Sequence, residues 1–440
     1  MFTLSFTYGH ALFHSLVVSF FFSSYLLTVL ILMVSYSEAL QIIMSEILTE
    51  LPMERVPLVL SLGRRLAEGI VAEENIPALP NSAMDGYAVQ WHDTSGASET
   101  DPLRLRVIGE SSAGEPFHEV VGSGQAVRIM TGGILPKGAD AVIEVESTEE
   151  EGEFVVVKRE IGLGTAVRSP GEDIRAGEEI IPAGKRLEPG DIGILASLGI
   201  TNVPVRVKPK VGIIATGNEV IDPHRKPEVG QIRNSGGPAL FAACVQAGAE
   251  PIDLGIVGDD REELLDALET GLQYDILLTT GGVSAGRYDL VQHLLPELGV
   301  EIRFHKVNIR PGKPVLFGVL KEGDRKTLAF GLPGNPVSSL VTFLTFVVPI
   351  LEKMLGGTYR PNSLQARSEE TILKNDAKRH FLRGILSYKD GEPYVRRTGT
   401  QSSGAMSSMS RANCLILFEE EKNRIASGDL VEVYLLSSTS

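Results

Sequence analysis

The 440-residue sequence has little cysteine and lacks several common catalytic patterns. Cys244 and Cys414 are its only cysteines, and each lies in an apolar context. Two cysteines cannot make a zinc site alone or a framework of disulfides, and they fit a reducing cytoplasm. There is no Walker sequence, no convincing Ser/His/Asp set and no histidine cluster spaced as metal ligands. These absences argue against P-loop, serine-hydrolase and histidine–zinc chemistry.

Charge is also missing from the N-terminus. Residues 1–37 carry no charged side chain, and 11–34 are mostly apolar. That stretch is long enough to span a membrane, which takes about 20 residues. However, no Lys or Arg precedes it, so it lacks the basic region of a signal peptide. From Met33 onward the pattern is that of an amphipathic helix of a soluble protein. We expect Met33 to be the functional start of a cytoplasmic protein, with residues 1–32 as an extension; a membrane anchor at 11–34 is the alternative.

Basic residues are outnumbered in the whole chain. The net charge of -15 argues against a nucleic-acid partner, so an anionic ligand would need locally gathered basic residues. Hydrophobic content of 43% and charged content of 22% are those of ordinary globular protein. A length of 440 residues predicts two to four domains.

The pattern of apolar residues changes along the chain. Residues 38–80 look helical, including Val59–Val71, until prolines at 77 and 80 end the pattern. Short strands separated by glycine and proline then predict a small β-domain over 103–170. From Val207 strands and helices alternate, which predicts a doubly wound α/β domain. After 358 the pattern is β-like again. The fold class is therefore α/β plus β, in several subdomains.

One glycine-rich stretch stands at the centre of the α/β pattern. The sequence TTGGVSAGRYD (279–289) follows an apolar strand at 274–278 and precedes a helix predicted at 290–298. A strand, a glycine-rich turn and a helix let backbone amides face a bound anion closely. Ser284 adds a hydroxyl donor and Asp289 a carboxylate. Asp289 has a second interpretation, as the cap of its helix.

Acidic residues follow several other strands and turns. Acids beside phosphate-binding glycines suggest a hard divalent ion such as Mg²⁺. Each also has a plainer interpretation, as a turn residue or a solvent-facing loop group. Loops that follow parallel strands meet at one edge of the sheet, so those carrying Glu219, Asp259, Ser284 and Gly334 should converge. The acids concerned are Asp85, Asp173, Glu219, Asp259 and Asp289.

Basic residues are expected at the same edge. Arg310 and Lys313 lie in the sequence RPGKP, with Lys306 upstream. Held between prolines near the glycine-rich stretch, Lys313 fits anion binding better than it fits an ordinary surface lysine. Asn335 lies in GLPGNP, where turn formation is its plainer interpretation.

Six segments together resemble the molybdopterin molybdotransferase family, which includes bacterial MoeA-type proteins and the E domain of gephyrin. The resemblance covers roughly residues 33–440, and 400–413 adds to it. Cys414 stands where relatives often have glycine, and we expect no chemical effect. The segments are NSAMDGYAV (81–89), IMTGG (129–133), ATGNEV (215–220), TTGGVSAGRYD (279–289), PGKP (311–314) and GLPGNPVSS (331–339).

The resemblance implies four subdomains in a homodimer with a shared active site. That site would lie between the α/β subdomain of one protomer and the β-rich subdomain of the other. After the extension at 1–32, the implied parts are an extended subdomain (33–80 with 171–206), a β-rich subdomain (81–170), a molybdopterin-binding α/β subdomain (207–358) and a C-terminal β-barrel (359–440).

The resemblance also implies a reaction, in which adenylylated molybdopterin and molybdate give molybdenum cofactor and AMP with Mg²⁺ required. Other cofactor-biosynthesis proteins are possible partners. A non-catalytic scaffold, a tungstate-using homologue and a molybdopterin adenylyltransferase are the alternatives. The implied catalytic residues are Asp85, Thr131, Asp173, Glu219, Asp259 and Asp289, of which Glu219, Asp259 and Asp289 would bind the metal. Substrate would be bound by Thr216, Gly281, Gly282, Ser284, Gly286, Arg310, Lys313, Pro333, Gly334 and Asn335.

Overall fold

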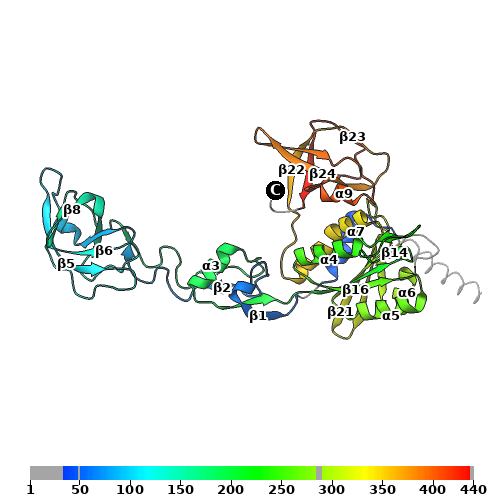
Figure 1. The fold of residues 1–440 in the computed structure, drawn as a ribbon, viewed down its shortest axis with the longest axis horizontal. Coiled ribbons are helices and arrows are strands. Elements are labelled where there is room, and N and C mark those ends of the chain that lie inside the picture. The colour runs from blue at the N-terminus through cyan, green and yellow to red at the C-terminus, as the bar shows by residue number, and fades with distance from the viewer. Residues whose placement is uncertain (1–32, 48–49, 284–289, 437–440) are drawn as a thin grey trace, which may run out of the picture. The chain divides into compact units, whose positions relative to one another are not determined.

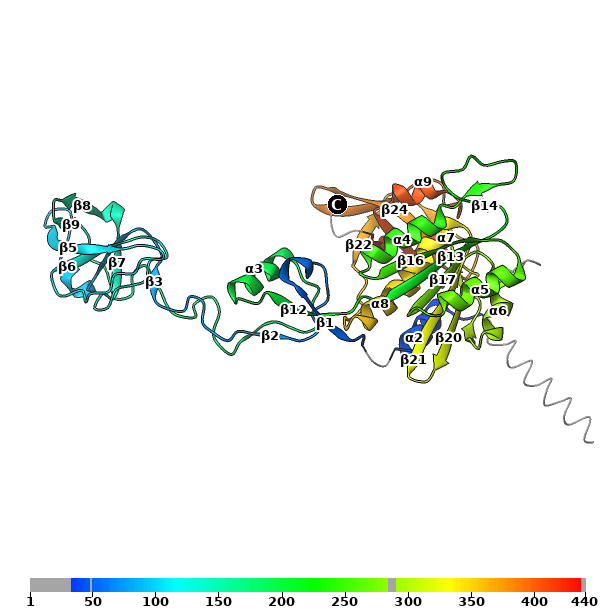
Figure 2. The same ribbon diagram turned by 60° about the horizontal axis from the view of Figure 1, so that its bottom comes forward.

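The structure, a computed structural model, describes residues 33–47, 50–283 and 290–436 (Figures 1 and 2). These residues form two compact units. The larger unit contains the residues up to Glu54, Gly63–Arg65 and everything from Val205 onward; it includes the α/β domain and the C-terminal strands. The smaller, β-rich unit consists of Arg55–Leu62 and Leu66–Pro204. Each unit is described by itself.

A six-stranded sheet forms the centre of the larger unit. Its four strands β16, β13, β17 and β21 are parallel, while β20 and β18 continue the sheet in antiparallel pairings. The predicted doubly wound α/β domain is confirmed, with an antiparallel edge that the alternating pattern had not indicated. The order is β16 (Glu250–Val257), β13 (Lys210–Thr216), β17 (Ile276–Thr280), β21 (Arg325–Leu332), β20 (Leu316–Glu322) and β18 (Glu301–Phe304).

Helices cover both faces of this sheet (Figure 2). Alternate residues of a strand point to opposite faces, and Ile213 and Leu278 accordingly join one apolar core while Ile214 and Leu277 join the other. The first core includes α2 (Tyr36–Ser45), α4 (Gly236–Gln246), α7 (Pro336–Thr342), the π-helical η4 (Phe343–Val347) and α8 (Val348–Met354). The second includes α5 (Arg261–Gly271) and α6 (Val291–Glu297).

A long helical run, Pro336–Met354, follows the GLPGNP segment. Among the described residues it is the one helix long and apolar enough to span a membrane, but 72% of its most apolar window is buried inside the protein. It therefore belongs to the core of the α/β domain. The predicted extension, residues 1–32, lies outside the described residues.

Helix α2 begins just after Met33, as the sequence predicted. Ser35 and Glu38 form a capping box, in which each side chain accepts a hydrogen bond from the other residue's backbone amide. Ala39 and Ile43 are fully buried in the α/β core, so the structure places α2 with the α/β domain and not with the extended part to which 33–80 was assigned.

The spacing of apolar residues over Val59–Val71 suggested a helix, and this prediction was wrong. The segment contains a single 3-10 turn, η1 (Leu58–Leu60), and a two-residue strand, β2 (Ile70–Val71), paired with β11 (Glu179–Ile181). Gly63 has a φ of 73°, which ends any right-handed helix there. Of the four apolar residues at helical spacing, Leu66 and Ile70 are buried while Val59 and Leu62 are 75% and 55% exposed, so they do not share one buried face.

The β-rich unit contains a six-stranded sheet, which confirms the small β-domain. The acidic run Glu149–Glu151 forms most of strand β8 and pairs with β9, so the turn of this hairpin lies at 152–153. Beyond the sheet, β3 (Asn81–Ser82) pairs with β10 (Val167–Arg168), and α3 (Pro189–Ser197) lies in the same unit. The sheet order is β7 (Ala141–Glu144), β4 (Gly86–Val89), β6 (Gln125–Ile129), β5 (Leu103–Ser111), β9 (Phe154–Val157) and β8 (Thr148–Glu151).

The C-terminal strands close into a five-stranded barrel through pairing of β24 with β26. A short strand of the α/β domain, β19 (Ile309–Arg310), joins this barrel by pairing with β24 in parallel. Cys414 is buried in the barrel core, and burial raises the pKa of its thiol to about 12. The ring is β24 (Arg379–Lys389), β25 (Glu392–Arg397), β22 (Ser363–Ser368), β28 (Leu430–Leu435) and β26 (Cys414–Phe418).

The remaining short elements complete the structure. They are β1 (Met53–Pro57), η2 (Trp91–Thr94), η3 (Val145–Ser147), β12 (Asn202–Arg206), β14 (Val220–Ile221), β15 (Ile232–Arg233), β23 (Ile372–Leu373), α9 (Met406–Ser410) and β27 (Arg424–Ile425).

Candidate functional site

The carboxyl ends of three parallel strands meet at Gly281. Its backbone amide donates to the carbonyl oxygen of Leu332, at the end of β21, at 3.0 Å. Gly281 has a φ of 106°, and a Cβ added there would lie 2.6 Å from Oγ1 of Thr216, the last residue of β13. Only glycine permits this conformation and this close approach. The predicted convergence of the strand-end loops is confirmed for the described residues.

The GLPGNP loop lies directly against this point. A Cβ added to Gly334 would be 3.5 Å from the Cα of Gly281, and the Thr280 hydroxyl lies 3.4 Å from the carbonyl oxygen of Pro333. Asn335 is the N-cap residue of α7, but its side chain makes no capping hydrogen bond, which leaves the amide available. Two glycine-rich loops thus form one surface, as anion binding requires.

A further pair of glycines, Gly236 and Gly237, lies at the same place and was not predicted from the sequence. Helix α4 begins at Gly236, where an added Cβ would lie 3.2 Å from the hydroxyl of Thr280. The amide of Gly237 donates to the Asn234 side chain at 2.9 Å. The sequence NSGG before an apolar helix was the pattern that could have indicated this helix start.

The acids Glu219 and Asp259 follow β13 and β16. Asn218 joins the two loops, because its side-chain oxygen accepts from the Asp259 amide at 3.0 Å and its own amide lies 3.5 Å from Asp259 Oδ2. The neighbouring Asp260 caps α5, so capping does not account for Asp259. A pocket of about 500 Å³ adjoins these loops, lined by Gly217, Asn218, Asn234, Arg225 and Gly258 among others.

Part of the predicted site lies outside the described residues, namely Ser284, Gly286 and Asp289. Helix α6 begins at Val291 with Leu290 as its N-cap residue. Among the described residues, no group of three or more His, Cys, Asp or Glu side chains could hold a metal ion. The predicted metal ligands Glu219, Asp259 and Asp289 include one undescribed member, so this set stays a prediction.

The RPGKP segment presents its basic residues to solvent. Lys313 is exposed, and the side chain of Arg310 is 63% exposed. The loop itself is fixed, because Pro311 and Gly312 are buried and a Cβ on Gly312 would lie 2.3 Å from Cγ2 of Thr342 in α7. Two cations on a rigid loop suit the predicted binding of an anion.

A buried arginine behind the site was also missed. The side chain of Arg383 donates to the Ser402 carbonyl oxygen at 3.0 Å and to the Ser408 hydroxyl at 3.2 Å, both uncharged acceptors. Burial lowers the pKa of its guanidinium to about 10, which still leaves it charged at neutral pH. The loop that it holds reaches α7, where the Val337 amide donates to the carbonyl oxygen of Ser403 at 3.2 Å.

In the β-rich unit the structure brings Asp85 and Thr131 together. Oδ1 of Asp85 accepts from the amide of Thr131 at 2.7 Å and from its hydroxyl at 2.8 Å. These two hydrogen bonds lower the pKa of Asp85 below its usual value, so this exposed carboxylate is ionised at neutral pH. The pair lines a pocket of about 720 Å³ together with Arg159, Glu144 and Glu146. Asp85 thus joins the turn before β4 to the end of β6, and its catalytic role stays a prediction.

Asp173 lies in a different pocket of the same unit. That pocket, of about 500 Å³, is lined by Ile76, Pro77, Asn81, Arg168, Glu172 and Asp173. Arg168 of β10 lines this pocket, while Thr165 and Ala166, just before β10, line the pocket of Asp85. Of the site residues predicted from this unit, Asp85 and Thr131 therefore line one pocket and Asp173 lines another.

Comparison with known families accounts for nearly the whole described chain. Three family models match in order: the MoeA N-terminal region (domains I and II) over 34–199, a probable molybdopterin-binding domain over 212–353 and the MoeA C-terminal region (domain IV) over 365–436. The Bacillus subtilis protein named molybdopterin molybdenumtransferase is 37% identical, and the alignment covers 86% of this chain and 88% of that protein.

This chain belongs to the MoeA family. Its Haemophilus influenzae relative, also named molybdopterin molybdenumtransferase, is 34% identical over 88% of this chain and 96% of that protein. A solved structure, the molybdopterin biosynthesis MoeA protein from Pyrococcus horikoshii, is 34% identical with a TM-score of 0.78, and covers 92% of this chain and all of that one. The family fold is thus present over nearly the whole described chain.

Proposed function

We propose that this member of the MoeA family is a molybdopterin molybdenumtransferase that inserts molybdenum from molybdate into adenylylated molybdopterin and releases AMP. The observation that carries the proposal is the meeting of Thr216, Gly281 and Gly334 at one edge of the α/β sheet. The glycines at this edge bring two strand-end loops close together, and glycine-rich loops that follow strands suit the binding of a phosphate group. The relatives' name supplies the class of reaction.

The described residues have distinct roles in this proposal. The glycine loops at 281–282 and 333–334, with Thr216 and Asn335, hold the substrate's phosphate. Arg310 and Lys313 attract molybdate and phosphate oxygens, since both are exposed cations on a fixed loop. Arg383 holds the loop carrying Ser402 beside α7 and adds positive charge from behind.

We propose that Mg²⁺ is required and that Glu219 and Asp259, with Asp289, hold it. Carboxylate oxygens are the ligands that Mg²⁺ prefers, and Glu219 is exposed while Asp259 is only partly buried. The ion would neutralise charge on the phosphoanhydride as AMP leaves. Asp85 and Asp173 supply further carboxylates, of which Asp85 is held ionised by Thr131.

We also propose that the protein acts as a homodimer with shared active sites. The family resemblance supports this arrangement, because it assigns Asp85 and Asp289 of one site to different protomers. The proposal explains why predicted catalytic residues lie both in the α/β domain and in the β-rich unit.

The direct experiment is to incubate the full chain with adenylylated molybdopterin, Mg²⁺ and molybdate while following AMP. The account predicts AMP release that depends on molybdate and Mg²⁺, together with formation of molybdenum cofactor. A folded protein that binds the substrate but releases no AMP would support a scaffold and overturn the proposal. Replacing molybdate with tungstate at equal concentration measures the metal preference.

A further inference from the structure

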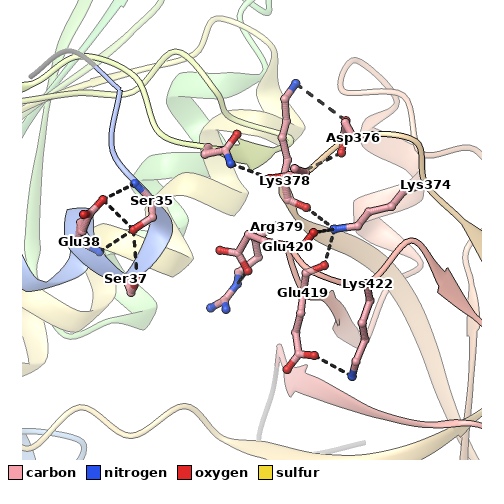
Figure 3. A network of polar contacts seen from close by, with 12 residues as sticks. Ser35, Ser37, Glu38, Lys374, Asp376, Lys378, Arg379, Glu419, Glu420 and Lys422 are labelled. Atoms are coloured by element: carbon pink, nitrogen blue, oxygen red, sulfur yellow. Dashed lines mark hydrogen bonds and ion pairs between the residues drawn. The ribbon is translucent and has the colours of Figure 1, made fainter. Parts of the chain in front are cut away.

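Asp376 stands beside the exposed arginine of the RPGKP loop. Oδ2 of Asp376 lies 3.8 Å from Nη1 of Arg310 and 4.0 Å from Nζ of Lys378. Figure 3 shows the contact with Lys378 at the edge of the C-terminal barrel. The side chain of Asp376 is only 25% exposed, whereas that of Arg310 is 63% exposed. The carboxylate is thus the fixed partner and the arginine the mobile one.

The carboxylate is itself held from two sides. Nε2 of His380 donates to Asp376 Oδ1 at 2.7 Å, and the Lys378 amide lies 3.3 Å from the same oxygen. Because His380 is 94% buried, with a relative exposure of 6%, its ring cannot move without disturbing the barrel. Burial lowers the pKa of His380 despite the nearby carboxylate, so the ring is neutral and donates this hydrogen bond at neutral pH.

Strand β24, which carries His380, also fixes the backbone of Arg310. In the parallel pairing of β19 with β24, Arg310 lies opposite His380 and Ile309 opposite Arg379. Asn308, just before β19, donates from its side chain to the Ala377 carbonyl oxygen at 2.7 Å and accepts at its own carbonyl from the Arg379 amide at 3.1 Å. The barrel therefore determines where the main chain of Arg310 lies, and Asp376 limits where its guanidinium reaches.

We propose that Asp376 is a positioning residue for Arg310, through which the C-terminal barrel pre-orders an anion-binding group of the active site. This inference rests on the proposed function for the anion-binding role of Arg310 and for the identity of the anion. An exposed arginine loses many side-chain conformations when it binds a ligand, and ordering it beforehand reduces that cost. His380 supports Asp376, and Asp376 in turn holds Arg310 within reach of the oxyanion.

A double-mutant cycle tests this with Asp376→Asn, Arg310→Gln and the combined variant, using molybdate as the probe. In AMP release, Asp376→Asn should raise KM for molybdate roughly two- to fivefold, as expected for an exposed ion pair, while kcat stays near wild type. In the Arg310→Gln background the same change should have no effect on KM. Asp376→Glu, which keeps the charge, should recover part of the loss.

The control is Glu420→Gln, which removes an ion pair of the same subdomain, Arg379 with Glu420 at 2.9 Å (Figure 3). It should leave KM for molybdate unchanged. Loss of an acid also removes a negative charge, which by itself would strengthen anion binding and lower KM for molybdate. The predicted rise in KM therefore has the opposite sign to this field effect. Measurement at about 0.1 M salt, where the Debye length is about 10 Å, limits the field effect without fully screening a pair 3.8 Å apart.

A second measurement needs no turnover. In arginine side-chain ¹⁵N relaxation, the Nε group of Arg310 should be more ordered in the wild type than in Asp376→Asn, and unaffected by Glu420→Gln. The inference is overturned if Arg310 is equally ordered in the wild type and in Asp376→Asn. It is also overturned if Asp376→Asn lowers KM for molybdate, or changes it equally with and without Arg310. A wild-type protein that shows the ordering but releases no AMP contradicts the proposed function and leaves the positioning role intact.

Discussion

The backbone amide of Gly281 lies 3.0 Å from the carbonyl oxygen of Leu332 and donates a hydrogen bond to it. This bond ties the loop after β17 to the loop after β21, so the two glycine-rich segments form one surface despite about fifty intervening residues. It is the local reason why Thr216, Gly281 and Gly334 can face a common ligand.

Replacing Gly281 with alanine should destabilise the protein by roughly 1–3 kcal/mol, because an L-residue is strained at positive φ. The added Cβ would also lie 2.6 Å from Thr216 Oγ1. Gly334→Ala is the matched control in the adjoining loop, since its Cβ would meet only an ordinary contact at 3.5 Å; it should change stability by no more than about 0.5 kcal/mol. Urea unfolding measures both, and equal stabilities would contradict the packing described here.

The Thr131 hydroxyl should be one of two groups that keep Asp85 ionised. Thr131→Val removes one hydrogen bond and should raise the pKa of Asp85 towards its ordinary value, which ¹³C-carboxyl titration by NMR would show. Thr165→Val is the control, because that hydroxyl lines the same pocket but donates to Gly162. An unchanged Asp85 pKa in Thr131→Val would leave the backbone amide as the whole cause.

The lowered pKa of Asp85 determines how the effect of Thr131→Val on stability depends on pH. Because the folded-state pKa of Asp85 is lowered, its contribution to stability is present above the unfolded value, near 3.9, and is lost as pH falls through the folded value. Thr131→Val should therefore cost stability at pH 7 but little at pH 2. A loss of equal size at both pH values would indicate altered packing instead.

His380 should make the protein less stable as pH falls from 7.5 to 5. Its pKa is lowered by burial, so below the ordinary value of 6.5 the unfolded chain binds the proton more readily than the folded one. Asp376 opposes this shift, whereas Lys374 and Arg310 add to it. In His380→Gln, which keeps a donor for Asp376, the free energy of unfolding should fall less over this range. A steeper fall than in the wild type would mean that His380 is protonated when folded.

Shared active sites predict complementation between two inactive variants. Asp85→Asn and Asp289→Asn should each abolish turnover, and after random exchange of subunits about a quarter of the sites should be intact. The control is a mixture of Asp85→Asn with an Asp85→Asn, Asp289→Asn double variant, which should stay inactive. No recovery despite demonstrated exchange would place both residues in one protomer's site.

Local pattern was sufficient to predict much of this fold. Apolar runs such as 274–278, followed by glycines and a helical spacing, led to the correct strand, loop and helix order, and parallel strands led to the convergence at Gly281. The same spacing failed at Val59–Val71, because Gly63 adopts a left-handed conformation; Leu66 and Ile70 are buried without a helix, while Val59 and Leu62 stay exposed. Spacing shows which residues would share a face in a helix, but not whether the segment is helical.

The site residues that were missed depend on contacts between distant segments. Asp376 is 66 residues from Arg310, and the two meet only because β19 leaves the α/β domain to pair with the barrel. Arg383 is charged yet almost fully buried, which no local pattern indicates. By contrast, the NSGG start of α4 was readable from the sequence and was overlooked in favour of the longer glycine motifs.

The central claim is that this chain couples loss of AMP to gain of molybdenum. The most direct measurement is a single-turnover reaction with adenylylated molybdopterin, Mg²⁺ and molybdate, in which AMP and molybdenum-containing cofactor are determined in the same sample. The account predicts that they form in equal amounts at the same rate in the wild type, and that Glu219→Gln forms little of either while still binding substrate. AMP released without incorporation of molybdenum, or molybdenum incorporated with the adenylyl group intact, would contradict it.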